Sequence, residues 1–295
     1  MERLPAWLRN HREPSKLRDV RLRLRKNRLL TVCEEARCPN ISECFSRNDA
    51  TFLILGDVCT RNCTFCSVTG GNPEPPDPDE PALLADAANE LGLKQVVITS
   101  VTRDDLPDSG AGHFAACIRE INKRLPGISV EVLTPDFSGR IDLLDIVLEA
   151  KPDVFVHNVE TVSSLYDRVR PEADLDRSLA VLNAAGRHGG SLVKTGFMVG
   201  LGESEHEIED LIVSIKEAGV DILTIGQYMR PTRKQVSVSK YWEPEAFEAW
   251  AGLAKGIGIR YVIAGPFVRS SYRAGNILEE IREQNRRKEN AVCQD

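Results

Sequence analysis

An α/β fold with a parallel sheet is the architecture that this sequence predicts. Along most of the chain, apolar runs of strand length alternate with amphipathic stretches of helix length. Strands that alternate with helices pair in parallel through right-handed βαβ units. The composition agrees, because the 295 residues are 42% hydrophobic and 28% charged, as in folded globular proteins. A partial (β/α) barrel and an open doubly wound sheet both match this pattern.

The individual elements follow in chain order. Six apolar runs predict strands at 51–56, 95–99, 128–133, 153–157, 192–199 and 221–225. Amphipathic spacing predicts helices near 82–91, 113–125, 141–150, 176–188 and 204–219. A further helix near 244–257 precedes a seventh strand at 260–264. The proline-rich stretch 70–78 predicts an extended connector, because proline fixes φ and disfavours helix at the residue before it.

The first 30 residues are strongly basic. They hold ten Lys or Arg against three Asp or Glu, a charge of +7, which leaves −13 of the total −6 for the rest of the chain. A cleaved organellar presequence would also be rich in serine, but only Ser15 precedes Thr31. A nucleic-acid-binding arm would be accompanied by a recognition fold, which the acidic remainder lacks. We therefore expect a helix over about 15–30 that faces solvent or a partner.

Membranes are not an expected partner either. The longest apolar runs have the length of strands, far short of the roughly 18 residues of a membrane span. Eight cysteines without a secretory leader indicate a reducing compartment, and we expect a cytoplasmic protein.

Six of the eight cysteines form two clusters within 34 residues. The first triad, Cys33, Cys38 and Cys44, has C-x4-C-x5-C spacing, and the second triad, Cys59, Cys63 and Cys66, has C-x3-C-x2-C spacing after the first strand. Structural zinc sites need four closed ligands, whereas each triad supplies three. Three thiolates around a 4Fe-4S cluster leave one iron open to a substrate, a cofactor or another protein ligand. Buried structural cysteines, or zinc sites completed by His or Asp, are the alternatives.

Two observations favour clusters. The second triad follows a barrel-type strand, and the loops at the carboxyl ends of such strands carry the chemistry of these folds. Two triads also flank a single strand. By contrast, Cys117 has the apolar spacing of a buried helical residue and Cys293 lies in the tail, so neither is expected to be a ligand.

These motifs resemble a known family. The second triad resembles the radical S-adenosylmethionine superfamily, and the first triad resembles the lipoyl synthases within it. The resemblance covers about residues 4–276; the tail 277–295 resembles only a polar helix and a loose end. It is carried in order by the segments 32–44, 55–66, 99–106, 158–161, 194–203 and 265–275.

The resemblance implies a partial (β/α)6 TIM-type barrel over 51–230. It also implies an N-terminal extension, 1–50, with the first triad, and a C-terminal extension, 231–295, with the segment Arg-Ser-Ser-Tyr at 269–272. Two 4Fe-4S clusters per chain and S-adenosylmethionine would be the cofactors. The second triad would hold the cluster that cleaves S-adenosylmethionine, and the first triad would hold an auxiliary cluster with Ser271, or alternatively Ser270, on its fourth iron.

In the family, the auxiliary cluster supplies the two sulfur atoms that are inserted at C6 and C8 of an octanoyl chain on a carrier lysine. The expected S-adenosylmethionine contacts are softer assignments, since strand-to-helix turns and capping groups would account for the same residues: Phe65, Asn158, Glu160, Gly196, Met198, Gly200 and Glu203. Arg269 is expected near the negative charge of the auxiliary cluster.

The resemblance also implies partners. These are octanoylated lipoyl carrier domains or the glycine cleavage H protein, a low-potential electron donor of the ferredoxin or flavodoxin type, and an iron-sulfur carrier that repairs the auxiliary cluster. The basic N-terminal arm is expected to dock acidic carrier domains. The chain departs from the family after Arg230-Pro-Thr, where a His-Leu-Pro-like stretch is usual, so the role of loop 231–240 in carrier contact is in doubt.

Two rival interpretations stay open. In one, both triads are closed metal staples that fasten the N-terminal segment to the barrel of a non-enzymatic scaffold. In the other, the chain is another two-cluster radical enzyme such as a methylthiotransferase. The spacing of the first triad and the lack of an extra RNA-binding domain weigh against the second rival.

Overall fold

One eight-stranded sheet organises the protein. The computed structural model describes residues 4–8, 17–47, 49–272, 275, 278–281 and 283. Seven strands run in parallel: β2 (Thr51–Ile54), β5 (Gln95–Ser100), β6 (Ser129–Leu133), β7 (Val154–Val156), β8 (Leu192–Val199), β9 (Ile222–Gln227) and β10 (Tyr261–Gly265). Short β1 (Leu30–Thr31) pairs antiparallel with β2 at one edge.

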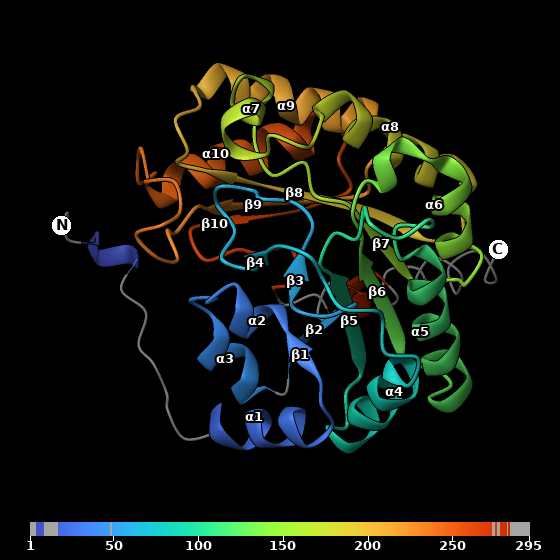
Figure 1. Ribbon diagram of the computed structural model, residues 1–295. Helices are drawn as coiled ribbons and strands as arrows, with labels where there is room; N and C mark the ends of the chain where they lie inside the picture. The colour runs from blue at the N-terminus through green and yellow to red at the C-terminus, as the bar shows by residue number, and fades with distance from the viewer. Residues whose placement is uncertain are drawn as a thin grey trace.

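The strand order identifies the architecture. The strands lie in sequence order from β1 and β2 through β5, β6, β7, β8 and β9 to β10, without the reversal of order that defines a doubly wound sheet. Within the described residues β1 and β10 are not paired with each other, so the barrel is partial. Figure 1 shows the strands curving through the centre with helices along their outer side. The prediction of a partial (β/α)6 barrel is confirmed.

Six helices follow the parallel strands and cover the outer face of the sheet. They are α4 (Glu80–Glu90), α5 (Ala111–Arg124), α6 (Ile141–Leu148), α8 (Leu175–His188), α9 (Glu205–Glu217) and α10 (Pro244–Gly256). Each turns an apolar stripe inward; in α5 that stripe includes Phe114, Cys117 and Ile121, all fully buried. The sequence placed these helices to within a few residues.

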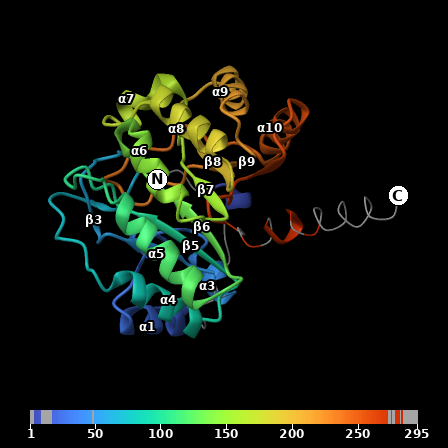
Figure 2. The same ribbon diagram turned by 90° about the vertical axis from the view of Figure 1, so that its right-hand side faces the viewer.

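The N-terminal extension covers the remaining side of the barrel (Figures 1 and 2). It contains η1 (Ala6–Leu8), α1 (Leu17–Lys26), α2 (Val32–Glu35) and α3 (Ile41–Ser46). The prediction of one helix over 15–30 was wrong at its end. The helix stops at Lys26, Arg28 takes a positive φ of 55°, and the chain then enters β1, because a positive φ cannot continue a right-handed helix.

The first predicted strand is also shorter than expected. It ends at Ile54 instead of residue 56, since Leu55 and Gly56 take φ values of 67° and 94° and turn the chain away from the sheet. This turn leads into β3 (Val58–Cys59), which pairs in parallel with β4 (Thr69–Gly70). The smaller elements are α7 (Tyr166–Val169), η2 (Phe137–Gly139) and η3 (Ser163–Leu165). Cys293 and nearly all of the tail 277–295 lie outside the described residues.

The inside of the barrel is apolar with one charged pair. Val154, Val156 and Ile222 pack there against Leu278 and Ile281 from the C-terminal segment. The Lys194 ammonium lies 2.8 Å from the Glu131 carboxylate, and both side chains are at most 2% exposed. No helix among the described residues is long and apolar enough to cross a membrane.

Candidate functional site

The second triad lies on the loop that follows β2. Cys59 is fixed by the β3–β4 pairing, in which Val58 faces Thr69 and Cys59 faces Gly70. Two backbone N–H groups donate to its sulfur, from Arg61 at 3.4 Å and from Thr102 at 3.3 Å. N–H donors directed at sulfur stabilise a thiolate, and they tune the potential of iron-sulfur clusters.

A network of ion pairs fixes the same loop. Arg61, between Cys59 and Cys63, donates two hydrogen bonds to Asp104 at 2.7 and 2.9 Å and one to Asp136 at 2.8 Å. Asp136 is fully buried and also accepts from Arg177 at 2.8 Å. Despite the cost of its burial, hydrogen bonds and charge from Arg61 hold the pKa of Asp136 well below its usual range. The loop is therefore anchored by Arg61, whose charge is paired with two carboxylates.

On its other side, the loop is tied to the segments after β7 and β9. Thr64 accepts a bond from the backbone N–H of Val236 at 2.9 Å, and its own N–H donates to the Val169 carbonyl at 3.0 Å. The Gln235 side chain donates to the Cys66 carbonyl at 3.0 Å. The backbone around all three cysteines is thus held by distant parts of the chain.

The thiols of the second triad are partly enclosed and affect one another. Burial, with smaller contributions from the neighbouring Cys63 and Cys59, raises the pKa of Cys66 to about 12. Burial also raises the pKa of Cys63, while the nearby Arg170 opposes that shift. Without metal the Cys63 and Cys66 thiols are protonated at neutral pH, and a metal would displace their protons on binding.

Asn158 and Glu160, expected to contact the cofactor, lie just after β7 and face the second triad. The Asn158 amide donates to Glu160 at 3.0 Å and to the Ser270 hydroxyl at 2.6 Å, while its Oδ1, although buried, has no partner among the described residues. Burial raises the pKa of Glu160, against the opposing charges of Arg170 and Arg269. An unpartnered buried oxygen beside an enclosed carboxyl fits a ligand that supplies polar hydrogens.

Gly196 and Gly200 supply close backbone approach on β8 and just after it. A Cβ on Gly196 would clash with the Thr224 hydroxyl and approach Asn158 Oδ1 to 3.3 Å. Gly200 takes a φ of 100°, and a Cβ there would clash with the Gln227 side chain. Both positions need glycine for the fold itself, and a cofactor contact at either one stays a prediction.

The remaining three residues that we expected to contact the cofactor, Glu203, Phe65 and Met198, have structural roles. The Glu203 carboxylate accepts from the backbone N–H groups of residues 200–202 and from the Trp242 indole at 3.1 Å. Phe65 and Met198 pack on a small apolar cluster with Tyr228. Cofactor contacts by these three residues also stay predictions.

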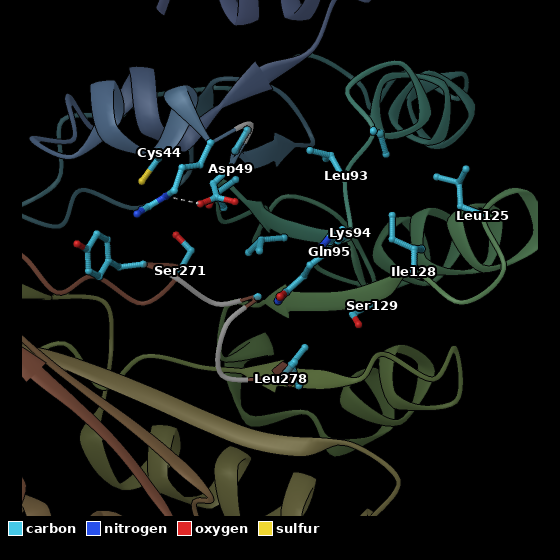
Figure 3. Close-up of a pocket in the computed structure, with 18 of the residues that line it drawn as sticks. Cys44, Asp49, Leu93, Lys94, Gln95, Leu125, Ile128, Ser129, Ser271 and Leu278 are labelled. Carbon is cyan, nitrogen blue, oxygen red and sulfur yellow. Dashed lines mark hydrogen bonds and ion pairs between the residues drawn. The ribbon is translucent and has the colours of Figure 1, made fainter. Parts of the chain in front are cut away.

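The first triad borders a cavity of about 880 Å³. Cys33 lies on α2, Cys44 on α3, and Cys38 between them, and all three line this cavity. Burial raises the pKa of Cys33 and of Cys44 to about 12, in each case with a contribution from neighbouring thiols of the same triad. Figure 3 shows Cys44 above Ser271 at the left of the view, with Gln95 to their right.

The cavity distinguishes the two candidate serines. Ser271 lines the cavity with the first triad, whereas Ser270 is not among its lining residues and accepts the bond from Asn158. Arg269 lines it as well; burial lowers the pKa of its guanidinium, while Cys38 and Glu160 raise it. Arg269 therefore lies between the first triad and the residues that face the second.

Neither triad is arranged as a site for a single ion. Among the described residues, no group of three or more His, Cys, Asp or Glu side chains converges to hold one metal ion. Cysteines that bind a cubane each ligate a different iron, so their sulfurs need not meet at one point. The donor sets, three thiols on one loop and three thiols facing a serine, fit two 4Fe-4S clusters.

Comparisons with known proteins agree with this geometry. Residues 53–226 match the radical SAM superfamily. The chain is 49% identical to the lipoyl synthase of Caldanaerobacter subterraneus over 92% of this chain and 96% of that protein. It is 50% identical to the lipoyl synthase of Rubrobacter xylanophilus over 94% of this chain and 87% of that protein.

The chain belongs to the lipoyl synthase family. Lipoyl synthases are radical SAM enzymes that use S-adenosylmethionine and two 4Fe-4S clusters. The predicted family, activity class and cofactors are confirmed, and the scaffold and methylthiotransferase interpretations are set aside.

Solved structures support the fold alone. SuiB of Streptococcus suis, bound to precursor peptide SuiA, superposes with a TM-score of 0.56 at 16% identity; the match covers 84% of this chain and 52% of that one. HydG, a maturase of the FeFe-hydrogenase, has a TM-score of 0.58 at 13% identity, covering 84% and 62%. This chain therefore spans about half of SuiB and shares its barrel.

Sequence reasoning missed the residues that brace the site. Arg61 was visible only as a spacer between two cysteines, and its partners Asp104 and Asp136 lie 43 and 75 residues away. Asn40, buried beside the first triad, donates to the Phe267 carbonyl at 2.6 Å, 227 residues away. The one available signal was the position of Arg61 between two cysteines, because a buried cation without a partner costs free energy.

Proposed function

We propose that this chain inserts sulfur at C6 and C8 of a protein-bound octanoyl-lysine, with the two triads in separate roles. The second triad would hold the radical cluster, and the first triad with Ser271 would hold the auxiliary cluster. The observation that carries this proposal is that one cavity brings Ser271 to the first triad, while Arg269 and Asn158 connect that segment to the residues facing the second.

At the second triad, the chain would orient and enclose the cofactor. A 4Fe-4S cluster there supplies one-electron cleavage of S-adenosylmethionine and hence a primary-carbon radical. Arg61, Asp104 and Asp136 keep the loop in one conformation, which limits the reorganisation needed when the ligand binds. Asn158 Oδ1 offers an acceptor for the ligand's ammonium or hydroxyl hydrogens, and Gly196 lets Thr224 and Asn158 pack closely against β8.

At the first triad, the chain holds a cluster that it must give up. Three thiolates bind iron strongly, whereas a serine hydroxyl is a harder and weaker match to a cluster iron. Ser271 on the fourth iron would therefore be the ligand that leaves most readily. The open cavity next to it leaves space for a substrate chain to approach the sulfur atoms.

The barrel interior suits an octanoyl chain. Its inner surface carries the partly exposed Leu133 and Ile263, and burying each methylene of an alkyl chain is worth about 0.8 kcal/mol. Apolar walls also keep other reactants away from an alkyl radical. The interior would thus select a saturated chain and protect it.

The partners follow from this chemistry. We propose lipoyl carrier domains or the glycine cleavage H protein as the bearer of the octanoyl-lysine, a low-potential ferredoxin or flavodoxin as electron donor, and an iron-sulfur carrier for repair. The functional units would be the N-terminal extension 1–50, the core 51–230 and the C-terminal extension 231–295, in a cytoplasmic protein.

Anaerobic reconstitution tests the proposal. We expect about eight irons per chain, formation of 5′-deoxyadenosine when reductant and S-adenosylmethionine are added, and an octanoyl-lysine peptide that gains two sulfur atoms by mass spectrometry. Cofactor cleavage without sulfur gain would redirect the proposal to another substrate. Bound zinc, or no cofactor cleavage, would contradict it.

A further inference from the structure

A basic loop lies against the second triad. This loop, residues 230–240, follows β9. Four of its side chains are cationic and exposed: Arg230, Arg233, Lys234 and Lys240. Arg230 donates to the carbonyls of Gln235 at 2.7 Å and Arg233 at 2.5 Å, so it shapes the loop.

The basic loop touches the cysteine loop directly. Gln235 donates to the Cys66 carbonyl at 3.0 Å, and the Val236 N–H donates to the Thr64 carbonyl at 2.9 Å. Tyr228 holds the loop from β9 by donating to the Val236 carbonyl at 2.8 Å. Gln235 and Val236 therefore follow directly after the exposed Lys234, and they hydrogen-bond to the loop that carries Cys66, a proposed cluster ligand.

The charge of this surface is not neutralised within the protein. No ion pair among the described residues involves Arg233 or Lys234. By contrast, Arg61, Arg103 and Arg124 each have a carboxylate within 4 Å. An exposed, uncompensated positive surface attracts and orients an acidic partner.

We propose that the basic loop is the docking surface for the acidic one-electron carrier protein, of the ferredoxin or flavodoxin type, that reduces the radical cluster. This inference rests on the proposed function. In the step, the carrier loses one electron and the cluster at the second triad gains it, and no bond forms or breaks. The electron would pass through the hydrogen bond from Gln235 to the backbone of Cys66.

The position of the loop favours a reductant over the octanoyl carrier. A substrate must reach both triads, because hydrogen is abstracted at one and sulfur is supplied at the other. The basic loop contacts only the second triad, and none of its residues lines the cavity of the first. A reductant needs access to the radical cluster alone.

Charge reversal tests the proposal on the reconstituted holoenzyme. The double variant Arg233→Glu, Lys234→Glu is compared with a control of equal charge change on the outer face of α5, Arg119→Glu, Lys123→Glu. The readout is 5′-deoxyadenosine formation, driven either by reduced flavodoxin at several concentrations and salt strengths or by dithionite, which needs no docking.

We expect the loop variant to need at least about tenfold more flavodoxin for half-maximal rate at low salt, and to lose the salt dependence that unaltered protein shows. Its rate with dithionite and the rates of the α5 control should stay within about twofold. Equal losses with both reductants, or none with flavodoxin, would overturn the proposal.

An altered requirement for the octanoyl carrier under dithionite would also overturn it, by assigning the loop to the substrate. Failure of the unaltered protein to cleave S-adenosylmethionine with dithionite would instead overturn the proposed function. The two failures are therefore distinguishable.

Discussion

The surroundings of the two triads differ in how firmly they are built. The second triad lies on one loop that is braced by a buried ionic network, by a two-stranded pairing and by backbone bonds from three distant segments. The first triad lies on two short helices beside a cavity of about 880 Å³, and bonds from single side chains, such as Asn40 to Phe267, Ser67 to Glu35 and Tyr272 to Glu43, tie these helices to other segments.

The difference matches two different duties. A cluster that is used again in each turnover benefits from ligands that are already in place, because little reorganisation is then needed. A cluster that gives up its sulfur must let the substrate approach and let its ligands separate. The chain thus pairs a rigid site with an open one across the same barrel.

The largest expected effect separates the triads by reaction step. Cys63→Ala should abolish both S-adenosylmethionine cleavage and product, whereas Cys38→Ala should abolish sulfur insertion and leave cleavage intact, because each triad has only three thiols. Iron content, 5′-deoxyadenosine and lipoyl product are measured together.

Cys117→Ala is the matched control. This fully buried thiol on α5 contacts neither triad's cavity, and its loss should cost about 1 kcal/mol of stability without changing iron content. Loss of cofactor cleavage in Cys38→Ala would erase the separation of roles.

The next effect tests the brace under the rigid site. Asp136→Asn leaves Arg61 without its buried carboxylate, and breaking such a pair should lower the free energy of unfolding by about 3 kcal/mol. Because the pKa of Asp136 is depressed in the fold, its contribution is complete above the unfolded value of about 4 and is lost only as pH falls through the folded pKa. The difference should therefore be constant from pH 5 to 8.

Urea unfolding under anaerobic conditions measures this difference. Asp142→Asn, which removes the carboxylate from an exposed pair with Arg140, should leave the midpoint unchanged. A similar loss in both variants would show that the buried network has no special role.

A smaller, pH-dependent effect comes from His157 in the same region. Its Nδ1 lies 3.0 Å from the Thr134 carbonyl and its Nε2 lies 3.1 Å from the Ser178 hydroxyl, and burial lowers its pKa to about 4. Since the unfolded value is about 6.5, stability should fall as pH drops below 6.5, by about 2 kcal/mol at pH 5. In His157→Gln this slope should disappear; an unchanged slope would show that other groups cause it.

The smallest effect concerns the open site. Ser271→Ala should lower lipoyl product at least about tenfold, roughly 1.4 kcal/mol, while cofactor cleavage continues. Ser270→Ala removes only the bond from Asn158 and should change product less. Product assays on both variants test this assignment. A larger loss of product in Ser270→Ala than in Ser271→Ala would assign the fourth ligand to Ser270.

Local patterns predicted most of the fold and part of the site. Period and capping located the parallel strands and their helices, and Cys117 was assigned to a helix core, as found. Strand order could not be predicted, because a partial barrel and a doubly wound sheet share the same local pattern. β1 was missed, since two residues carry no periodicity.

The braces of the site were out of reach for a different reason. Arg61 with Asp136, and Asn40 with Phe267, join segments 75 and 227 residues apart, and no local signal identifies such pairs. The choice between Ser270 and Ser271 likewise depends on which hydroxyl faces a cavity that only the folded chain creates.

A single-turnover iron count tests the division of labour most directly. Holoenzyme is mixed with reductant, S-adenosylmethionine and octanoyl-lysine peptide, without an iron-sulfur carrier, and released iron is measured with product. The account predicts that about four irons leave per lipoyl group formed, and that the protein still cleaves S-adenosylmethionine afterwards. Retention of all iron, or loss of cofactor cleavage in step with product, would contradict it.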